Sequence, residues 1–347
     1  MMRYESSVTS LSWIPSEAVT GSTKAAFEGG FTHYDDPPPG EIASSGERSV
    51  DGLRAADRFR FANVLRGWVE TDGDGHITGA GYAVDSGGLM GSTTVNLGPM
   101  QRTFQAVQLP ELRRDPVYGN GWVRFAQTTG GRTGLPAPRR VAHPPYVQWQ
   151  APTVWTTLSL TLHADGHAEI GVPGASRFPR HWVYDGDGKL ARKSGLTEFR
   201  EWYRKSFGRH TPWGDEDSAA LIVEVESALE RSLSVQLMHG AAKPRIATFG
   251  AGTALVRQGQ PGTDVYLILD GVLRVECDGE PLAEYGPGAM LGERAGLESG
   301  TRTASLVAVT PCKVAAVDGA MLDRSSLAEL SAGHRREDAG RAVADRA

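Results

Sequence analysis

Residues 291–304 read LGERAGLESGTRTA. This stretch places one carboxylate, Glu293, and one guanidinium, Arg302, on either side of a short helix-like turn. Backbone N–H groups at the start of a helix point toward a bound anion, and an arginine adds a charge-assisted contact. An ionised carboxylate only accepts hydrogen bonds, so Glu293 suits a hydroxyl group. The small residues nearby are Gly292, Ala295, Gly296, Gly300 and Ala304. The stretch therefore predicts a cavity for a small anion that also carries a hydroxyl.

The residues before this stretch form a run of strand-like segments separated by glycine. From Phe249 the sequence reads FGAGTALVRQGQPGTDVYLILDGVLRV, and Gly286-Pro287-Gly288 follows. Together with 291–304, these segments make the C-terminal third of the chain, 243–335, resemble the cyclic nucleotide-binding domain family. The resemblance implies a β-roll with flanking helices for this part and says nothing about the rest of the chain.

The family's phosphate-binding cassette reads Gly-Glu-x-Ala-Leu, then a short variable loop, then Arg-Thr/Ala-Ala. The resemblance implies that Glu293 accepts a hydrogen bond from the ribose 2′-hydroxyl and that Arg302 pairs with the cyclic phosphate. It further implies donors from the amides of residues 293–295 and a contact of Thr303 with the phosphate or the base. The expected ligand-binding residues are Gly292, Glu293, Arg294, Ala295, Arg302, Thr303 and Ala304.

The sequence does not decide whether the base of the ligand is adenine or guanine. Thr303 allows the hydroxyl contact to guanine that the family associates with cGMP, but bacterial cAMP binders also tolerate threonine there. No aromatic residue follows Tyr285, so a lid over the base would be aliphatic, from Met321, Leu322, Leu327 or Leu330. The expected ligand is a cyclic nucleotide, cAMP or cGMP, without a metal. The alternative is a domain that keeps the roll and binds nothing; the two charged anchors favour binding.

The bulk composition limits the classes of partner. The net charge of −5 and the isoelectric point near 6.0 argue against a broad nucleic-acid-binding face. Two cysteines, Cys277 and Cys312, fit reduced thiols better than a disulfide-stapled secreted protein. The N-terminus has no apolar core of signal-peptide length, and no stretch has the length of a transmembrane span. We expect a cytoplasmic protein with no nucleic-acid or membrane partner.

The chain before the roll is predicted to be mainly antiparallel β structure. Residues 1–55 are rich in turns and are expected to form a partly ordered arm, too short to bury a core of its own. Residues 56–195 are expected to form an antiparallel β-barrel or sandwich, because closure or stacking protects sheet edges. The strand candidates are 59–70, 76–84, 92–97, 103–109, 121–127, 157–162, 168–172 and 181–184.

The hairpin around Asp165 allows two registers. A two-residue loop would place Leu162 opposite Glu169, whereas a three-residue loop of Asp165, Gly166 and His167 places Leu162 opposite Ile170. The second register keeps one face apolar and is preferred. It brings His163 beside Glu169 on the polar face, where a solvated pair is favoured over a metal site that would include His167.

Residues 196–242 show helical spacing and are expected to form a helical connector between the domains. All eight tryptophans lie at or before Trp213, so a domain boundary is expected between about 210 and 243. Residues 336–347 are expected to be a charged tail. Only 29 residues follow Asp318, so a helix-turn-helix domain is not expected there, and a transcription-factor function is disfavoured.

Two other motifs are assigned to turns. ETDGDGHITGAG resembles a calcium loop around Asp72 and Asp74, but Gly81 stands where the bidentate glutamate belongs, so a hairpin turn is favoured. WVYDGDG at 182–188 echoes WVETDGDG at 68–75, which is consistent with a duplication or with common turn chemistry. No nucleophile elbow, Cys/His pair or zinc-type cysteine spacing occurs, so no catalytic residue and no metal ligand is predicted.

The preferred interpretation is a cytosolic cyclic nucleotide sensor that regulates its N-terminal β domain or a protein partner in signal transduction. The first alternative is an enzyme or small-ligand-binding barrel that the nucleotide domain regulates, although an enzyme is disfavoured. The second is a scaffold or assembly protein. The sequence leaves open the ligand of the N-terminal domain, cAMP versus cGMP, the oligomeric state, including a homo-oligomer, and the direction of regulation.

Overall fold

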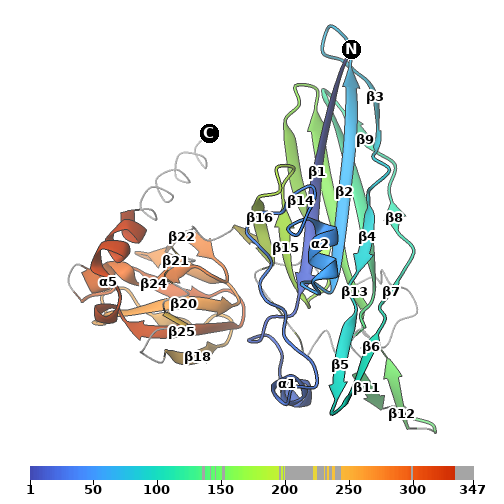
Figure 1. Ribbon diagram of the computed structural model, residues 1–347. Coiled ribbons are helices and arrows are strands. Elements are labelled where there is room, and N and C mark those ends of the chain that lie inside the picture. Colours follow the sequence, from blue (N-terminus) through green and yellow to red (C-terminus); the bar gives the residue numbers. More distant parts are fainter. Residues whose placement is uncertain are drawn as a thin grey trace. The chain divides into compact units, whose positions relative to one another are not determined.

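The computed structural model divides the chain into two compact units, Met1–Ile222 and Val223–Ala347 (Figure 1). The described residues are 1–134, 137–140, 142–144, 146–150, 153–194, 197, 199, 222–224, 230, 233, 237, 238, 244–297 and 300–332. Within these ranges, no helix combines the length and apolar character needed to cross a bilayer. Each unit has its own hydrophobic clusters and is described by itself.

The N-terminal unit contains a seven-stranded sheet in the order β17-β16-β15-β1-β2-β3, with β4 also paired to β2. Its long central strands are β1 (Met2–Trp13) and β2 (Phe61–Thr71). The others are β3 (Ile77–Tyr82), β4 (Gly87–Met90), β15 (Arg180–Tyr184), β16 (Leu190–Ser194) and β17 (Ile222–Glu224). Helix α1 (Gly21–Glu28) and helix α2 (Val50–Ala55) lie in the connection between β1 and β2.

A second, six-stranded sheet follows the order β14-β13-β10-β7, with β8 and β9 also paired to β10. Its central strands are β10 (Trp122–Arg132) and β13 (Thr153–His163). The others are β7 (Val107–Gln108), β8 (Leu112–Arg113), β9 (Val117–Gly119) and β14 (Ala168–Ala175). Two separate hairpins are β5 (Thr93–Leu97) with β6 (Met100–Phe104), and β11 (Ala137–Arg140) with β12 (Val147–Gln150).

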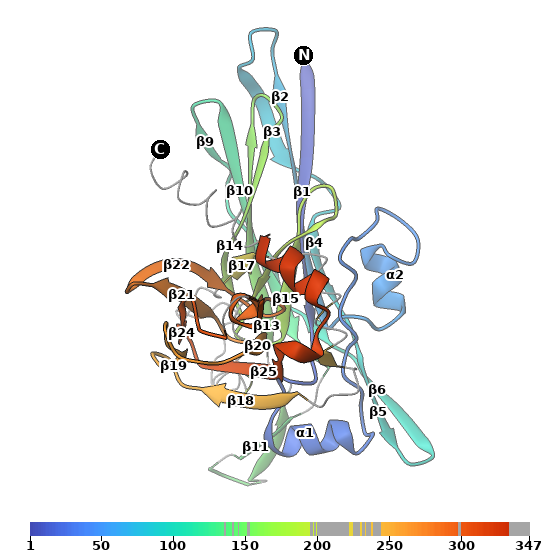
Figure 2. The same cartoon turned by 90° about the vertical axis from the view of Figure 1, so that its left-hand side faces the viewer.

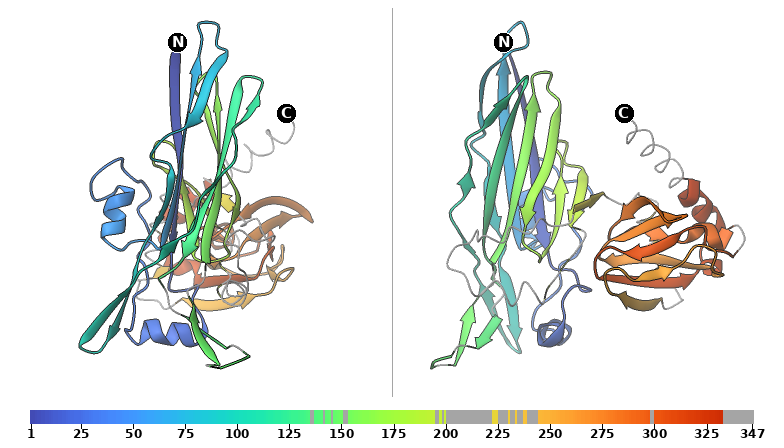
Figure 3. Two further views of the ribbon diagram at one scale, coloured as in Figure 1. Left: turned by 90° about the vertical axis from the view of Figure 1, so that its right-hand side faces the viewer. Right: turned by 180° about the vertical axis from the view of Figure 1, so that it is seen from behind.

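The two large sheets lie face to face (Figure 3), and alternating side chains from both fill one end of the space between them. The cluster at this end contains Val8, Leu65, Val69, Val123, Phe125, Leu158, Leu160, Leu162 and Val183. Period-two alternation in a half-buried strand produces such a layer. The expected mainly β class is therefore confirmed, and of the two expected closures the N-terminal unit adopts the sandwich.

Further along the same strands, the space between the sheets becomes polar. Ser10 of β1 and Thr156 of β13 share a hydroxyl hydrogen bond of 3.0 Å. The Asn63 amide donates to the Thr156 carbonyl at 3.0 Å and accepts from Gln127 Nε2 at 2.8 Å. All four side chains are fully buried. Because buried polar groups are costly unless paired, this layer fixes the relative position of the two sheets.

A buried histidine lies at the edge of the polar layer. His181 Nε2 is 2.6 Å from the carbonyl oxygen of Ser176, and His181 Nδ1 is 2.7 Å from Ser12 Oγ. A carbonyl can only accept, so Nε2 carries the proton and Nδ1 accepts from the Ser12 hydroxyl. The imidazole is therefore held neutral between two strands and a turn.

The expectation of a partly ordered arm at 1–55 is wrong for its first strand. β1 lies between β2 and β15, with Ser10 opposite Asn63 on one side and Val183 on the other. A segment too short to build its own core can still be ordered when it inserts into a sheet that supplies partners on both edges. The following residues also pack, because Phe27 of α1 and Leu53 of α2 are buried.

The loop of the β13–β14 hairpin differs from both expected registers. His163 N donates to His167 O at 2.9 Å, so the three loop residues are Ala164, Asp165 and Gly166. Leu162 consequently faces Ala168, a shift of two residues from the preferred register. A shift of two keeps every side chain on its expected face. His163 Nε2 still contacts Glu169 Oε1, at 3.1 Å, on the polar face.

The C-terminal unit is a roll of two four-stranded antiparallel sheets (Figures 1 and 2). The first follows the order β18 (Arg245–Phe249), β25 (Cys312–Asp318), β20 (Asp264–Asp270) and β23 (Met290–Leu291). The second follows the order β19 (Ala254–Val256), β24 (Ser305–Ala308), β21 (Leu273–Cys277) and β22 (Glu280–Tyr285). Among the described residues from 244 onward, the helical elements are α5 (Glu293–Leu297), η1 (Gly319–Met321) and 324–332.

Most of the helical connector expected at 196–242 lies outside the described residues, as does the charged tail expected at 336–347. Positions 199, 230, 233, 237 and 238 are helical. Ile222–Glu224 forms β17 instead of the expected helix, because β16 offers an edge and the β-branched residues Ile222 and Val223 favour strands. Leu233 and Leu237 pack with Leu327 and Leu330 against the first sheet of the roll.

We predict that His181 makes the N-terminal unit less stable in acid. Complete burial lowers the pKa of His181 from 6.5 to about 4. Between these values the unfolded chain binds a proton that the folded chain does not. The free energy of unfolding therefore falls as the pH decreases from 6.5 toward 4, by about 1.4 kcal/mol per pH unit and about 3 kcal/mol in total.

Urea unfolding followed by tryptophan fluorescence measures this effect, because all eight tryptophans lie at or before Trp213 and report only the N-terminal unit. The His181→Gln variant cannot titrate, so its free energy of unfolding should depend less steeply on pH between 6.5 and 4.5. Equal slopes in the two proteins would show that His181 is not the group responsible.

Candidate functional site

The stretch 291–304 connects β23 to β24 and lines one side of a pocket in the C-terminal unit. Gly292 follows β23, Glu293 begins α5, and Arg302 lies three residues before Ser305, the first residue of β24. The pocket is open to solvent and has a cavity volume of about 80 Å³. Its lining includes all seven predicted residues, Gly292, Glu293, Arg294, Ala295, Arg302, Thr303 and Ala304.

Gly292 gives the cassette its backbone conformation. Its φ of +95° lies in the left-handed region that side chains disfavour. A Cβ at this position would approach the Asp264 carbonyl oxygen to 2.8 Å and Arg302 Nη1 to 2.9 Å. The chain therefore turns tightly from β23 into α5 while its backbone lies against the guanidinium of Arg302.

Arg302 is a buried cation, with only 4% of its surface exposed. Nη1 donates to the Asp264 carbonyl oxygen at 2.7 Å, and Nη2 donates to the Tyr266 hydroxyl at 3.2 Å. Nε has no hydrogen-bond partner, and no described carboxylate forms an ion pair with the guanidinium. A buried charge is expected to have an opposite charge nearby. Arg302 thus has two neutral partners and an uncompensated positive charge.

The phenol of Tyr266 lies against this guanidinium, whose Cζ is 5.2 Å from the ring centroid. Burial raises the pKa of Tyr266, with Arg302 acting in the opposite direction. The phenol is therefore neutral near neutral pH and does not neutralise Arg302. Tyr266 belongs to the strand quoted for the resemblance, but no sequence motif indicates that its hydroxyl would hold the arginine.

Glu293 is the second buried charge of the pocket, also 4% exposed. It is the first residue of α5, where a carboxylate interacts favourably with the start of the helix. The Arg294 guanidinium approaches it, with Nε 3.9 Å from Glu293 Oε1. Glu293 and Arg302 therefore place an acceptor and a donor of opposite charge in one pocket, as the spacing of the cassette predicts.

The remaining wall of the pocket is mostly apolar, and it includes a thiol from Cys277. Its apolar side chains are Val256, Val275, Leu282, Tyr285, Leu291 and Leu306. The expected aliphatic lid lies elsewhere: Leu322, Leu327 and Leu330 pack in the core beside the first sheet, and Met321 is 67% exposed. The pocket can thus hold a flat apolar group against these aliphatic side chains and the ring of Tyr285.

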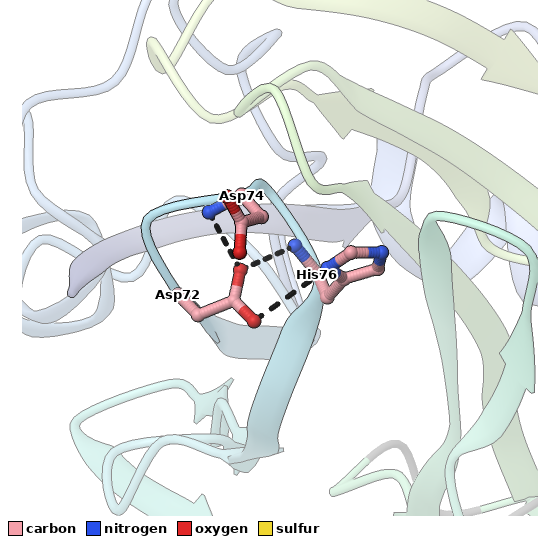
Figure 4. A group of neighbouring side chains, drawn as sticks. All are labelled: Asp72, Asp74 and His76. Atoms are coloured by element: carbon pink, nitrogen blue, oxygen red, sulfur yellow. Dashed lines mark hydrogen bonds and ion pairs between the residues drawn. The ribbon is translucent and has the colours of Figure 1, made fainter.

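The turn between β2 and β3 gathers Asp72, Asp74 and His76 (Figure 4). Asp72 Oδ1 accepts from the backbone N–H groups of Asp74 and His76, at 3.0 and 2.8 Å. The turn between β15 and β16 repeats this arrangement, because Asp185 Oδ1 accepts from Asp187 N and Lys189 N at 3.0 and 2.9 Å. The two turns thus share the same Asx-turn hydrogen bonds, which is consistent with common turn chemistry.

Comparison with known proteins identifies the C-terminal part of the chain. A model of the cyclic nucleotide-binding domain family matches residues 246–325. The resemblance drawn from the cassette is confirmed, and these residues form a cyclic nucleotide-binding domain. No family model matches the N-terminal region.

Several solved structures are similar to part of the chain. A cyclic nucleotide-binding domain from Methylobacillus flagellatus KT shares 24% identity over 29% of this chain and 66% of its own, with a TM-score of 0.26. The cAMP-bound regulatory domain of Toxoplasma gondii PKA shares 24% over 31% and 50%, with a TM-score of 0.26. The c-di-GMP-responsive regulator CLP of Xanthomonas campestris shares 24% over 33% and 57%, with a TM-score of 0.24. The chain thus matches less than two thirds of each of these proteins.

We predict that Gly292→Ala destabilises the C-terminal unit by roughly 1–3 kcal/mol, because the new Cβ adds backbone strain and meets Asp264 and Arg302. Gly296→Ala is the matched control. Its Cβ would lie 3.5 Å from the nearest atom, within the short helix α5, where alanine is favoured over glycine by up to about 1 kcal/mol.

Hydrogen-exchange mass spectrometry in increasing urea, read on peptides from β20 and β25, measures both variants in the unit that lacks tryptophan. Equal urea midpoints for Gly292→Ala and the unaltered chain would mean that the cassette does not depend on this backbone conformation.

Proposed function

We propose that the C-terminal unit binds a cyclic nucleotide, cAMP or cGMP, in the pocket around Arg302 and that binding regulates the N-terminal β-sandwich or a protein partner. The observation that carries the proposal is the buried guanidinium of Arg302, whose described partners are one carbonyl and one phenol. An anion of the right size would supply the missing negative charge.

The charge balance favours a phosphodiester over a neutral ligand. Arg302 is buried by the protein alone, so much of its desolvation has already occurred before a ligand arrives. A cyclic phosphate carries one negative charge and two free oxygens, which match a guanidinium that uses only two of its five N–H groups and whose Nε–H has no described partner. The start of α5 adds backbone N–H groups on the same side.

The second anchor supports a nucleoside over a bare phosphate. Glu293 offers carboxylate oxygens in the same pocket, and a carboxylate rejects an anion but accepts a hydrogen bond from a hydroxyl. In a ribose-3′,5′-cyclic phosphate, the 2′-hydroxyl lies on the ring next to the phosphate. The aliphatic wall then receives the base by apolar contact.

Regulation requires a route from the pocket to other parts of the chain. Met290, two residues before Gly292, donates its backbone N–H to Glu230 Oε1 at 3.0 Å. Leu233 and Leu237 pack in the same cluster as Met290 and Leu327. A ligand that orders the cassette would therefore change the packing of helical residues that precede the roll, as a population shift between two arrangements.

The alternative of an enzyme or a ligand-binding barrel in the N-terminal unit receives less support. Side chains from both sheets fill the apolar end of the sandwich, and paired polar groups fill the next layer. His181, one of the histidines that could serve such a site, is fully buried and held by Ser12 and Ser176. A scaffolding role remains compatible with a nucleotide-regulated partner surface.

We predict that Arg302→Ala lowers the affinity for cAMP or cGMP by roughly 100-fold or more, because the phosphate loses its buried cation. Arg302→Lys keeps the charge but loses the planar fork, so an intermediate loss is expected. Arg274→Ala is the matched control: Arg274 also belongs to the roll, but it pairs with Glu276 at 2.8 Å outside the pocket.

Isothermal calorimetry gives the affinities, and hydrogen exchange of β20 and β25 verifies that each variant is folded. Folded Arg302→Ala protein with the affinity of the unaltered chain would refute the site.

We predict a specific coupling between Glu293 and the ribose 2′-hydroxyl. Removing the hydroxyl with a 2′-deoxy cyclic nucleotide should weaken binding to the unaltered chain about tenfold or more, because a hydrogen bond to a charged group is lost. In Glu293→Ala, the same change of ligand should have little further effect. Calorimetry on the four combinations gives a double-mutant cycle, and equal losses for both proteins would separate Glu293 from the hydroxyl.

A further inference from the structure

Cys277 is the last residue of β21 and lies in the wall of the nucleotide pocket. Its side chain is partly exposed. The thiol sulfur is 3.9 Å from the carbonyl oxygen of Thr303, the residue that follows Arg302 in the cassette. Any group attached to this sulfur would therefore enter the space beside the cassette.

Two polar side chains flank the thiol on the solvent side. Gln258 Nε2 lies 3.6 Å from the sulfur, and Asp278 Oδ2 lies 3.7 Å from it. Gln258 also donates to the other carboxylate oxygen of Asp278 at 3.0 Å. The thiol is thus held at the mouth of a pocket that is open to solvent, in reach of reagents in solution.

The second cysteine has the opposite environment. Cys312 is 3% exposed, and its sulfur contacts the carbonyl oxygens of Val272 and Thr310 at 3.1 Å. Burial raises the pKa of the Cys312 thiol, which suppresses the reactive thiolate. Cys312 is therefore an unreactive internal control for any reaction of Cys277.

An independent feature shows that the space beside Cys277 is built for a ligand. Arg302 lines the same pocket, is more than nine-tenths buried, and keeps Nε without a described hydrogen-bond partner. The pocket wall thus combines a cation that needs an anion with a thiol that solution reagents can reach.

We propose that Cys277 is a redox-sensitive modification site whose mixed disulfide with a small thiol excludes the cyclic nucleotide; this inference rests on the proposed function. In the reaction, the Cys277 thiolate attacks one sulfur of a low-molecular-weight disulfide such as oxidised glutathione. A new S–S bond forms to Cys277, the original S–S bond breaks, and the other half leaves as a thiolate that takes up the proton released by Cys277.

The modification and the nucleotide compete for one space. A glutathionyl group is comparable in size to a cyclic nucleotide and carries net negative charge, so it would fill the pocket and lie near Glu293 and Arg302. The exclusion works in both directions, because a bound nucleotide covers the sulfur. Reduction by an excess of thiol reverses the reaction and reopens the pocket.

The test treats the reduced full chain with oxidised glutathione, or with iodoacetamide, in the presence and absence of saturating cAMP or cGMP. Mass spectrometry of peptides containing Cys277 and Cys312 gives the rate at each thiol. We expect nucleotide to slow the reaction of Cys277 at least tenfold and to leave the much slower reaction of Cys312 unchanged. Calorimetry on the glutathionylated protein should show at least a tenfold loss of affinity that dithiothreitol restores.

Cys277→Ser is the matched variant. Whatever its affinity, treatment with oxidised glutathione should not change it, because the remaining thiol is buried. Nucleotide binding that survives stoichiometric modification of Cys277, or equal reaction rates with and without bound nucleotide, overturns this proposal and leaves the proposed function standing. Absence of nucleotide binding to the reduced, unmodified chain overturns both.

Discussion

The C-terminal unit depends on a buried positive charge, that of Arg302, which forms no ion pair with a carboxylate of the described residues. Arg302 is fixed by the Asp264 carbonyl and the Tyr266 phenol, both on β20, and by the backbone of Gly292 beside it. These contacts satisfy two of its N–H groups and define the direction of the guanidinium, but they are neutral and leave its charge uncompensated. The free-energy cost of desolvating Arg302 arises when the protein folds, before any ligand binds. A ligand with one negative charge therefore gains the electrostatic interaction without a second desolvation of the cation. Glu293 limits which anion can bind, because its carboxylate repels a second negative charge and accepts a hydrogen bond from a hydroxyl group.

In the N-terminal unit, which is also built from antiparallel sheets, the contacts between the two sheets determine their relative position. One end of the sandwich is an apolar layer around Phe125 and Leu160, and the next layer is a network of Ser10, Asn63, Gln127 and Thr156. An apolar layer tolerates sliding of one sheet over the other, whereas amide and hydroxyl pairs are satisfied in one register only. His181 extends this network and links its integrity to protonation. The unit therefore has the properties of a rigid platform.

The cassette could be recognised from sequence because its chemistry is local. Gly292, Glu293 and Arg302 lie within eleven positions of one another, and their spacing alone predicts the pocket that the structure shows. The partners of Arg302 could not be found this way, since Asp264 and Tyr266 are about forty residues distant and act through a carbonyl and a phenol that many strands possess. The place of β1 was missed for a similar reason: its pairing joins residues about 50 to 70 positions apart in β2 and more than 160 positions apart in β15. For the β13–β14 hairpin, the predicted faces of the strands are correct but the predicted loop residues are wrong. Alternation of apolar and polar residues determines which face each side chain takes, and this is unchanged when the register shifts by two residues.

We infer that the charge on Arg302 is completed by a cyclic nucleotide. Calorimetric titration of the unaltered full chain with cAMP and with cGMP tests it most directly, with the corresponding 5′-monophosphates as controls that carry an additional charge and an open phosphate. We expect saturable binding of at least one cyclic nucleotide at one site per chain, with much weaker binding of the linear nucleotides. Absence of saturable binding for both cyclic nucleotides, or equal affinity for the cyclic and linear forms, would contradict it.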